Sequence, residues 1–599
     1  MLSRGAPVGL GHGNGSREMA RRAHAWGLVA VVLFAGLAFR LFQIQVLGHA
    51  HHRRRAEATQ GRRWPIPAPR GNLYDRNGTP LALNLKLYSI AADPKLIAKP
   101  KWRARQLAPL LRMPAAELAS KLAPKEPRWV PLRASVDEPV ATRVRKLDCA
   151  GVIVSTEWQR AYPHLTAAAA VLGFVGKDRR GLAGLEAAAD RWLRGRDGEM
   201  MVVLDGRRPG SRGEIPGRTV LTREMVPGSS VVLTLDLEIQ AIAEEALAKA
   251  VEAAQAKGGT ALVMDPETGD ILALATLPGF DPNQFTKFPP ETWVSQAIAS
   301  PYEPGSTFKV ITAAAALEEG VMSHGETYHC SGSRPVGNRT ISCALHGGTR
   351  AHGLVDLDQM VVKSCNVGMG TLAMLLGASR LHHWAQRLGF GQRTGIELGG
   401  ESPGRLAPPS TWSLVQTANV GFGQGVSVTA LQLLRAYAAI ANGGWLVAPR
   451  LVKAIMEPGG GASAPTRPAR RRVLSAATCR RLRSDLEKVV EEGTGTRAQV
   501  PGRRVAGKTG TAQKPMPGVG YRSGKYIGSF VGFAPVDKPR LAVLVAIDEP
   551  QGSHYGGVVA APAFREICER ALAYLRVPPD GPRAAELTIA SGAPATGAD

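Results

Sequence analysis

Three short patterns in the chain hold the residue types that serine-based nucleophilic catalysis requires. Each occurs once: Ser306-Thr-Phe-Lys309, Ser364-Cys-Asn366 and Lys508-Thr-Gly510. A serine hydroxyl becomes an effective nucleophile only when a neighbouring base removes its proton. Residues that match only one of these patterns more often lie on a solvated surface, but all three patterns in this order favour a single catalytic site.

Ser306 is predicted to lie at the start of a helix. Pro304-Gly305 indicates a turn, and the residues from Thr307 through an alanine run have helical character. The free N–H groups and the positive dipole end of such a helix favour a negatively charged oxygen. Lys309 follows one turn later on the same face. If burial or a neighbouring cation lowers the pKa of its amine, Lys309 can accept the Ser306 proton.

The second pattern is expected to face the same cleft. Ser364 and Asn366 lie two residues apart, so in an extended segment both side chains point the same way. Ser364 can then relay a proton to a leaving amine, and Asn366 can hold a substrate amide.

The third pattern is typical of a strand whose glycines allow close backbone approach. Lys508 supplies a positive charge for a substrate carboxylate. We predict that Thr509, Gly510 and Thr511 bind substrate, with the Thr511 N–H completing an oxyanion hole.

With these patterns the chain resembles the penicillin-binding serine acyltransferases, specifically class B penicillin-binding proteins of the cell-division type. The resemblance covers roughly residues 25 to 575. One departure is Cys365, where the family usually has serine. Further matching stretches are Arg70-Gly-Asn-Leu-Tyr-Asp-Arg-Asn-Gly, Gly181-Leu-Ala-Gly-Leu-Glu186, Tyr302-Glu-Pro-Gly-Ser306, Gly423-Gln-Gly-Val-Ser-Val-Thr429, Tyr526-Ile-Gly-Ser-Phe-Val-Gly-Phe-Ala-Pro535 and Ile547-Asp-Glu-Pro550.

The resemblance implies a peptidoglycan D,D-transpeptidase that cross-links stem peptides through a Ser306 acyl-enzyme during septal cell-wall synthesis. It further implies inhibition by β-lactams, no metal and no cofactor. The implied partners are stem peptides, the lipid-linked precursor, the membrane, a polytopic glycosyltransferase and other division proteins. An elongation-type transpeptidase, a β-lactamase and a penicillin sensor stay open as alternatives. The Glu-x-x-Leu-Asn pattern of a deacylating loop is absent from the sequence.

The elements around these patterns predict a mixed α/β fold of the α+β kind. Two β-rich runs flank the turn Asp265-Pro-Glu-Thr-Gly-Asp and indicate a hairpin. Asp236 is placed to cap a long helix over 237–255. Strands over 526–533 and 541–547 and a closing helix over 561–575 complete one antiparallel sheet with helices on its faces.

The chain divides into an anchor and two domains in this interpretation. We predict a cytoplasmic tail, a transmembrane anchor, a pedestal of the dimerisation type, a transpeptidase domain and a disordered tail; their bounds are 1–24, 25–46, 47–225, 226–576 and 577–599. The anchor is the apolar run AWGLVAVVLFAGLAFRLFQIQV, long enough to span the hydrocarbon layer. No small-residue cleavage site follows it, which favours an uncleaved anchor over a signal peptide. The bulk of the chain is then extracytoplasmic.

The large excess of basic over acidic residues indicates an anionic partner. The net charge is +25, and before residue 64 ten arginines face only two glutamates. Because these arginines bracket the apolar run, lipid headgroups explain them better than nucleic acid does, and no nucleic-acid partner is predicted.

The six cysteines carry a weaker signal. Cys330 and Cys343 bound a Gly/Ser/Arg-rich loop and could pair in an oxidising compartment, while a buried free thiol is the simplest interpretation of the others. Sequence alone leaves the pairing open.

A phosphate-binding loop is the main competing interpretation of the third pattern. Gly502-Arg-Arg-Val-Ala-Gly-Lys508-Thr509 satisfies Gly-x4-Gly-Lys-Thr. Such a loop opens a helix with its lysine, but two prolines and a glycine follow here, so we reject this interpretation.

Overall fold

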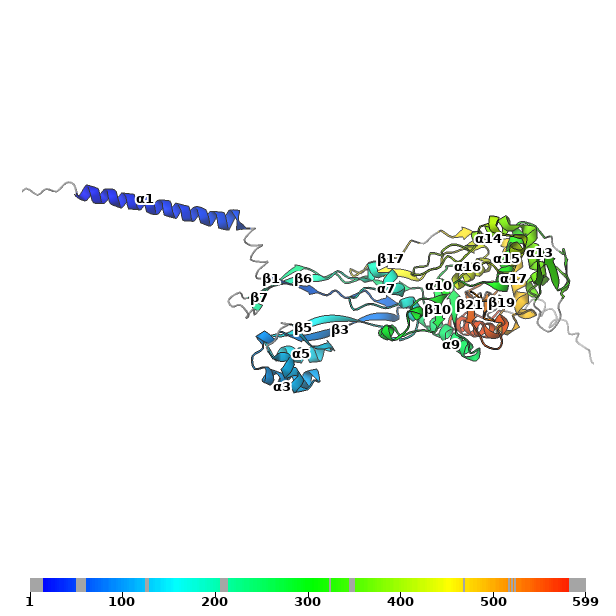
Figure 1. Cartoon of the computed structure of the whole chain (residues 1–599), viewed down its shortest axis with the longest axis horizontal. Helices are drawn as coiled ribbons and strands as arrows, with labels where there is room; N and C mark the ends of the chain where they lie inside the picture. The colour runs from blue at the N-terminus through cyan, green and yellow to red at the C-terminus, as the bar shows by residue number, and fades with distance from the viewer. Residues whose placement is uncertain are drawn as a thin grey trace, which may run out of the picture. The chain divides into compact units, whose positions relative to one another are not determined.

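The computed structural model describes residues 15–49, 61–123, 129–204, 214–322, 325–343, 351–466, 469–514, 518, 521 and 524–580 (Figure 1). The chain forms two compact units. The first consists of Met1–Pro67, Lys86–Glu157 and Asp197–Met225. The second consists of Ala68–Leu85, Trp158–Arg196 and Val226–Asp599. The chain therefore passes more than once from one unit to the other.

The described chain begins with one long apolar helix. α1 (Gly15–Phe42) continues into a π-helical turn at Gln43–Leu47. The stretch Met19–Leu47 has a mean hydropathy of 2.1, and its most apolar part is not buried at all. Its length and composition suffice to cross a membrane, and the predicted span 25–46 lies within it.

The first unit contains one antiparallel sheet and part of a second group of strands. β1 (Gly61–Ile66), β6 (Gly198–Leu204) and β7 (Glu214–Arg223) form one sheet in that order. In the second group, β3 (Pro80–Ala92) pairs with β4 (Val130–Val136) and with β5 (Val152–Ala161), and residues 80–85 of β3 and 158–161 of β5 belong to the second unit. The apolar residues of α3 (Pro100–Leu111), α4 (Ala115–Leu122) and α5 (Glu138–Lys146) form a core with these strands.

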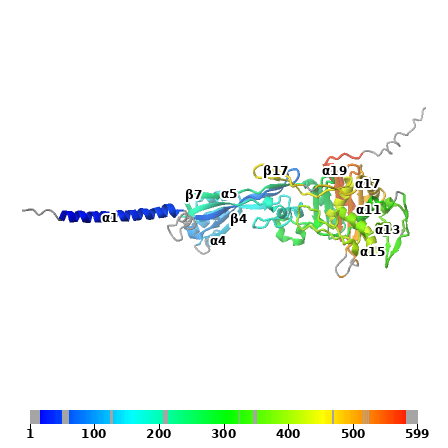
Figure 2. The same ribbon diagram turned by 90° about the horizontal axis from the view of Figure 1, so that it is seen from above.

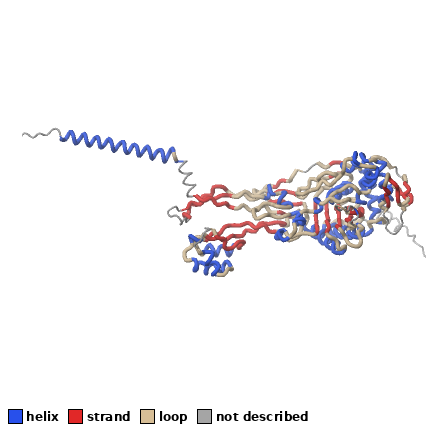
Figure 3. Tube along the Cα trace, in the orientation of Figure 1, coloured by secondary structure: helices blue, strands red, loops and turns tan. Residues whose placement is uncertain are grey.

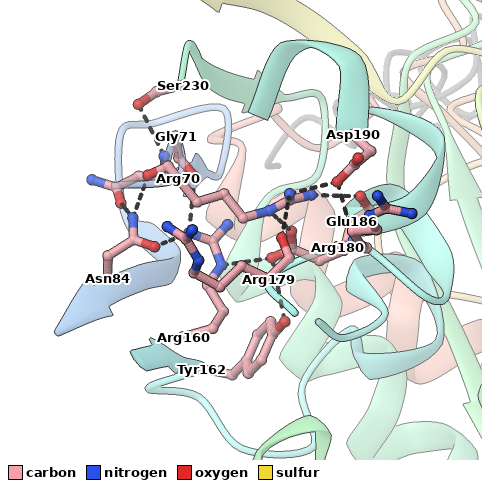
Figure 4. A network of polar contacts seen from close by, with 12 residues as sticks. Arg70, Gly71, Asn84, Arg160, Tyr162, Arg179, Arg180, Glu186, Asp190 and Ser230 are labelled. Carbon is pink, nitrogen blue, oxygen red and sulfur yellow. Dashed lines mark hydrogen bonds and ion pairs between the residues drawn. The ribbon is translucent and has the colours of Figure 1, made fainter. Parts of the chain in front are cut away.

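A buried network of charges organises the N-terminal part of the second unit (Figure 4). The Glu186 carboxylate lies in α7 (Gly184–Ala188) and accepts hydrogen bonds from the Nε of Arg70 and of Arg160, both at 2.6 Å. Arg70 also donates to Asp190 at 2.5 Å. The Glu186 side chain is fully buried. A buried carboxylate without partners is very costly, so this network ties the segment around Arg70, just before β2, to the short helices α7 and α8.

An antiparallel sheet of five strands forms the centre of the second unit. Its order is β10 (Ile271–Leu277), β9 (Gly258–Met264), β21 (Leu541–Asp548), β20 (Tyr526–Ala534) and β19 (Ala506–Gln513). Alternate residues of a strand face opposite sides. In β21, Val543, Val545 and Ile547 therefore enter one core while Ala542 and Leu544 enter the other.

Helices cover both faces of this sheet (Figures 1 and 2). α9 (Leu237–Ala253) and α19 (Ala561–Tyr574) pack on one face, and α16 (Ala430–Ala441) packs on the other. Figure 3 shows the strands of this sheet with helices around them.

The remaining helices are α6 (Ala169–Leu172), α8 (Asp190–Leu193), α10 (Gln296–Ala299), α11 (Lys309–Glu318), α12 (Leu357–Val362), α13 (Asn366–Leu376), α14 (Ala378–Arg387), α15 (Leu414–Gly421), α17 (Ala476–Glu491) and α18 (Gly556–Val559). The remaining strands are β2 (Leu73–Tyr74), β8 (Ser230–Leu233), β11 (Tyr328–Cys330), β12 (Ser333–Val336), β13 (Arg339–Ser342), β14 (Gly353–Val355), β15 (Trp445–Leu446), β16 (Val452–Met456), β17 (Ala462–Ser463) and β18 (Arg471–Arg472).

The fold class predicted from sequence is confirmed. The predicted hairpin is β9–β10, and the helix predicted over 237–255 is α9. Asp236 caps it as expected, because its carboxylate accepts from the backbone N–H groups of Glu238 and Ile239. Residues 581–599 of the predicted disordered tail and residues 1–14 of the predicted cytoplasmic tail lie outside the described residues.

Candidate active site

Ser306 lies in a tight turn at the start of a helix. Residues Gly305–Phe308 form a 3₁₀ turn that leads directly into α11, and Ser306 is half-buried. The turn is held by close backbone contact, since Gly305 N donates to Gly423 O at 3.1 Å. A Cβ atom on Gly423 would lie 2.1 Å from the Gly305 carbonyl oxygen, so only glycine fits there.

Lys309 is the first residue of α11 and lies one turn after Ser306. Its side chain is fully buried, and its Nζ donates to the Ser364 carbonyl oxygen at 2.5 Å and to the Ser364 Oγ at 3.0 Å. Burial lowers the pKa of this amine to about 8. A substantial fraction of Lys309 is therefore neutral near pH 8 and able to accept a proton.

The segment that carries Ser364 and Asn366 differs from the prediction. It is not extended: Ser364 has a φ of +55° between α12 and α13, and Asn366 is the first residue of α13. The expectation of two parallel side chains in an extended segment is therefore wrong. The left-handed backbone instead lets Ser364 present its carbonyl and hydroxyl oxygens to Lys309, while the Asn366 Nδ2 donates to Ser342 O at 3.0 Å.

Lys508 lies in β19 and is also fully buried. Its Nζ lies 3.4 Å from the Thr509 Oγ1 and 3.5 Å from the Thr509 carbonyl oxygen. Burial, and next the positive charge of Lys309, hold the pKa of the Lys508 amine well below its usual range. In the described part of the chain no carboxylate pairs with this amine. A bound anion would supply the missing partner.

β19 is an edge strand that runs beside the Ser306 turn. Among the described strands it pairs only with β20, which leaves its other edge available. A Cβ atom on Gly510 would lie 2.9 Å from the Thr307 Cγ2, which shows how closely strand and turn approach. Thr509 Oγ1 lies 2.7 Å from Thr494 Oγ1, and Thr511 Oγ1 accepts from Gly556 N at 3.3 Å.

Sequence reasoning missed residues that support the turn. Tyr437 is fully buried in α16 and donates its hydroxyl to the Thr307 carbonyl oxygen at 2.8 Å. Thr312 Oγ1 donates to Gly421 O at 2.8 Å. Both contacts join segments far apart in sequence, and no local pattern marks either residue.

The class of protein follows from this arrangement together with family comparison. Residues 259–569 match the penicillin binding protein transpeptidase domain, and residues 65–233 match the penicillin-binding protein dimerisation domain. The chain belongs to the penicillin-binding protein transpeptidase family.

Individual relatives extend over most of the chain. It is 35% identical over 559 residues to Stage V sporulation protein D of Bacillus subtilis, covering 92% of this chain and 85% of the relative. It is 32% identical over 525 residues to peptidoglycan D,D-transpeptidase FtsI of Escherichia coli, covering 86% and 85%. The crystal structure of penicillin binding protein 3 from Mycobacterium tuberculosis, complexed with aztreonam, has a TM-score of 0.67 and 32% identity, covering 87% of this chain and 99% of that one.

Proposed function

We propose that this protein is a peptidoglycan D,D-transpeptidase that works through a Ser306 acyl-enzyme. The observation that carries the proposal is the buried Lys309 amine, hydrogen-bonded to Ser364 and one helical turn from Ser306. The names of the relatives in Bacillus subtilis and Escherichia coli and the family match support it.

Acylation begins with proton removal from Ser306 by neutral Lys309. The Ser306 Oγ then attacks the carbonyl carbon of the penultimate D-alanine, and the backbone N–H groups of Ser306 and Thr511 stabilise the oxyanion. Lys309 and Ser364, already joined by a hydrogen bond, pass the proton to the leaving D-alanine amine. This step forms a Ser306 ester and releases the terminal D-alanine.

Lys508 binds the terminal carboxylate of the donor peptide. Its buried amine gains a counter-ion when the substrate carboxylate binds. Binding of the carboxylate and protonation of the Lys508 amine therefore favour each other. Asn366 holds a substrate amide, and Thr509 and Gly510 line the strand along which the peptide lies. An amine from a second stem peptide then attacks the ester and completes the cross-link.

The setting of this activity is the outer side of the cytoplasmic membrane. α1 anchors the chain as a single span, with the residues before it in the cytoplasm and the residues after it outside. The protein acts in septal synthesis on stem peptides made from the lipid-linked precursor, together with a polytopic glycosyltransferase and other division proteins. The sporulation and FtsI-type relatives support a septal over an elongation role.

The first experiment is covalent labelling with a fluorescent penicillin. The wild-type chain is expected to form an adduct that survives denaturation, and Ser306→Ala is expected to form none. Ser463→Ala, an exposed serine in β17, is the matched control and should label as wild type. An adduct on Ser306→Ala would contradict the assignment of the nucleophile.

The lifetime of the same adduct distinguishes a transpeptidase from a β-lactamase. No pattern in the sequence places an additional carboxylate to activate a water. The penicilloyl ester should therefore persist far longer than the time it takes to form. Sustained hydrolysis of a chromogenic cephalosporin, lost in Ser306→Ala, would instead assign a β-lactamase.

A further inference from the structure

Three cysteines and a histidine converge next to the segment that carries Ser364 and Asn366. The Sγ atoms of Cys330, Cys343 and Cys365 and a ring nitrogen of His352 all lie within 4.8 Å of one another. The three thiols are buried, and His352 is half-buried. Neither the proposed acylation step nor the binding of a substrate uses any of these four side chains.

The distances within this cluster fit a tetrahedral metal site. With Zn–S bonds of about 2.3 Å and Zn–N bonds of about 2.0–2.1 Å, tetrahedral angles place two sulfurs about 3.8 Å apart and a sulfur and a nitrogen about 3.6 Å apart. Cys330 Sγ lies 3.6 Å from Cys343 Sγ and 3.5 Å from His352 Nδ1. Cys343 Sγ lies 3.7 Å from Cys365 Sγ.

The ligands come from four separate short elements. Cys330 ends β11, and His352 immediately precedes β14, which pairs with β11 so that Cys330 lies opposite Gly353. Cys343 directly follows β13, and Cys365 is the N-cap residue of α13. A metal bound here would join two small two-stranded sheets to the start of a helix, elements too short to hold one another by apolar packing alone.

Backbone donors point at two of the sulfurs. Val367 N donates to Cys343 Sγ at 3.4 Å, and Gly368 N donates to Cys365 Sγ at 3.2 Å. Both donors lie in the first turn of α13, whose positive dipole end favours a thiolate over a thiol. Thiolate is the form in which cysteine binds a metal.

A disulfide explains the cluster less well than a metal does. A bridge brings two sulfurs to about 2.0 Å and leaves the third cysteine and the histidine without a role. Four convergent ligands, three of them soft thiolates, suit Zn²⁺, whereas Mg²⁺ and Ca²⁺ prefer oxygen ligands.

We propose that Cys330, Cys343, His352 and Cys365 bind a structural Zn²⁺. The site positions the second catalytic pattern, because Cys365 stands between Ser364 and Asn366. It also anchors Cys343, which directly follows the Ser342 carbonyl that accepts from Asn366. The left-handed backbone at Ser364, on which its contact with Lys309 depends, is thereby held in place.

The sequence hides this site because the ligand spacings are 13, 9 and 13 residues along the chain. Zinc-finger patterns have a pair of cysteines with two to four residues between them, and this chain brings its ligands together only through the fold.

The test measures zinc in the full-length chain, purified in detergent without chelator, by elemental analysis. The wild type is expected to contain about one zinc per chain. Cys365→Ser keeps a residue that can cap α13 and should lose at least about 100-fold in zinc affinity, since even outer-shell changes cost about 10–100-fold. Cys568→Ala, a buried thiol outside the cluster, is the matched control and should keep its zinc.

Cobalt provides a second measurement that does not depend on a variant folding. After removal of zinc, Co²⁺ added to the wild type should give thiolate-to-cobalt charge-transfer bands and the visible bands of a tetrahedral site. Wild-type protein that takes up neither metal, full zinc content in Cys365→Ser, or a Cys330–Cys343 disulfide in the intact chain would each overturn the proposal. None of these readouts depends on penicillin labelling, so the proposal can fail while the transpeptidase assignment stands.

Discussion

The pKa of Lys309 makes the proposed base testable by the pH dependence of acylation. A pKa of about 8 instead of 10.5 corresponds to about 3.4 kcal/mol in favour of the neutral amine. About one molecule in ten then carries a neutral Lys309 at pH 7, and about half do at pH 8. Because only the neutral amine accepts the Ser306 proton, the rate constant for acylation should rise about tenfold per pH unit below 8 and level off above it.

The assay is the time course of penicillin labelling between pH 6 and pH 10. Lys309→Arg keeps the positive charge but cannot lose its proton, so it should slow acylation by about 10²–10⁴-fold at every pH. Lys363→Arg, an exposed lysine next to Ser364, is the matched control and should retain the wild-type profile. A rate that keeps rising beyond pH 9.5, or rapid acylation of Lys309→Arg, would refute Lys309 as the base.

Two further predictions concern other buried charges. Lys508→Ala should slow acylation by a penicillin about 10- to 150-fold, the equivalent of about 1.5–3 kcal/mol for a lost charge-assisted hydrogen bond, and should affect a carboxylate-free analogue much less; equal slowing of both compounds would mean that Lys508 moves protons instead. Glu186→Gln should lower the free energy of unfolding by about 3–5 kcal/mol, because Arg70 and Arg160 lose a buried counter-ion. Asp178→Asn, which removes an exposed partner of Arg180, should cost about 1 kcal/mol or less, and similar losses in the two variants by denaturant titration would contradict the importance of the network.

Much of the fold could be predicted because local signals and tertiary structure agree. The β9–β10 hairpin has β-rich runs around a Pro/Gly turn, and α9 has both helical periodicity and the Asp236 cap. β21 is an apolar run up to its last residue, and β20 is mostly apolar with small residues between, as is usual for strands buried on both faces. The predicted domain boundary at 225–226 stays a prediction. The second compact unit also includes Ala68–Leu85 and Trp158–Arg196, and no local sequence signal marks these crossings between the units.

The residue types of the candidate site could be predicted from the sequence, but its backbone conformation could not. Ser-x-Asn indicates two polar side chains and says nothing of φ, so the left-handed Ser364 could not be inferred. The fit of Gly423 against Gly305 and the hydrogen bond from Tyr437 depend on segments more than a hundred residues away. The cysteine and histidine cluster was missed for the same reason, since its four members are spread over 36 positions in the sequence.

The turn that carries Ser306 also limits how this protein can evolve. Its neighbours at Gly423 and Gly510 have no room for a side chain, and the atoms they would strike include the backbone of the turn itself. Any larger residue at either position would move the nucleophile and impair the natural reaction together with its inhibition. Few single substitutions next to Ser306 can therefore confer resistance to an inhibitor that binds at this site. Resistant variants must arise at positions that already carry a side chain, such as half-buried Thr511, or at residues that act from further away.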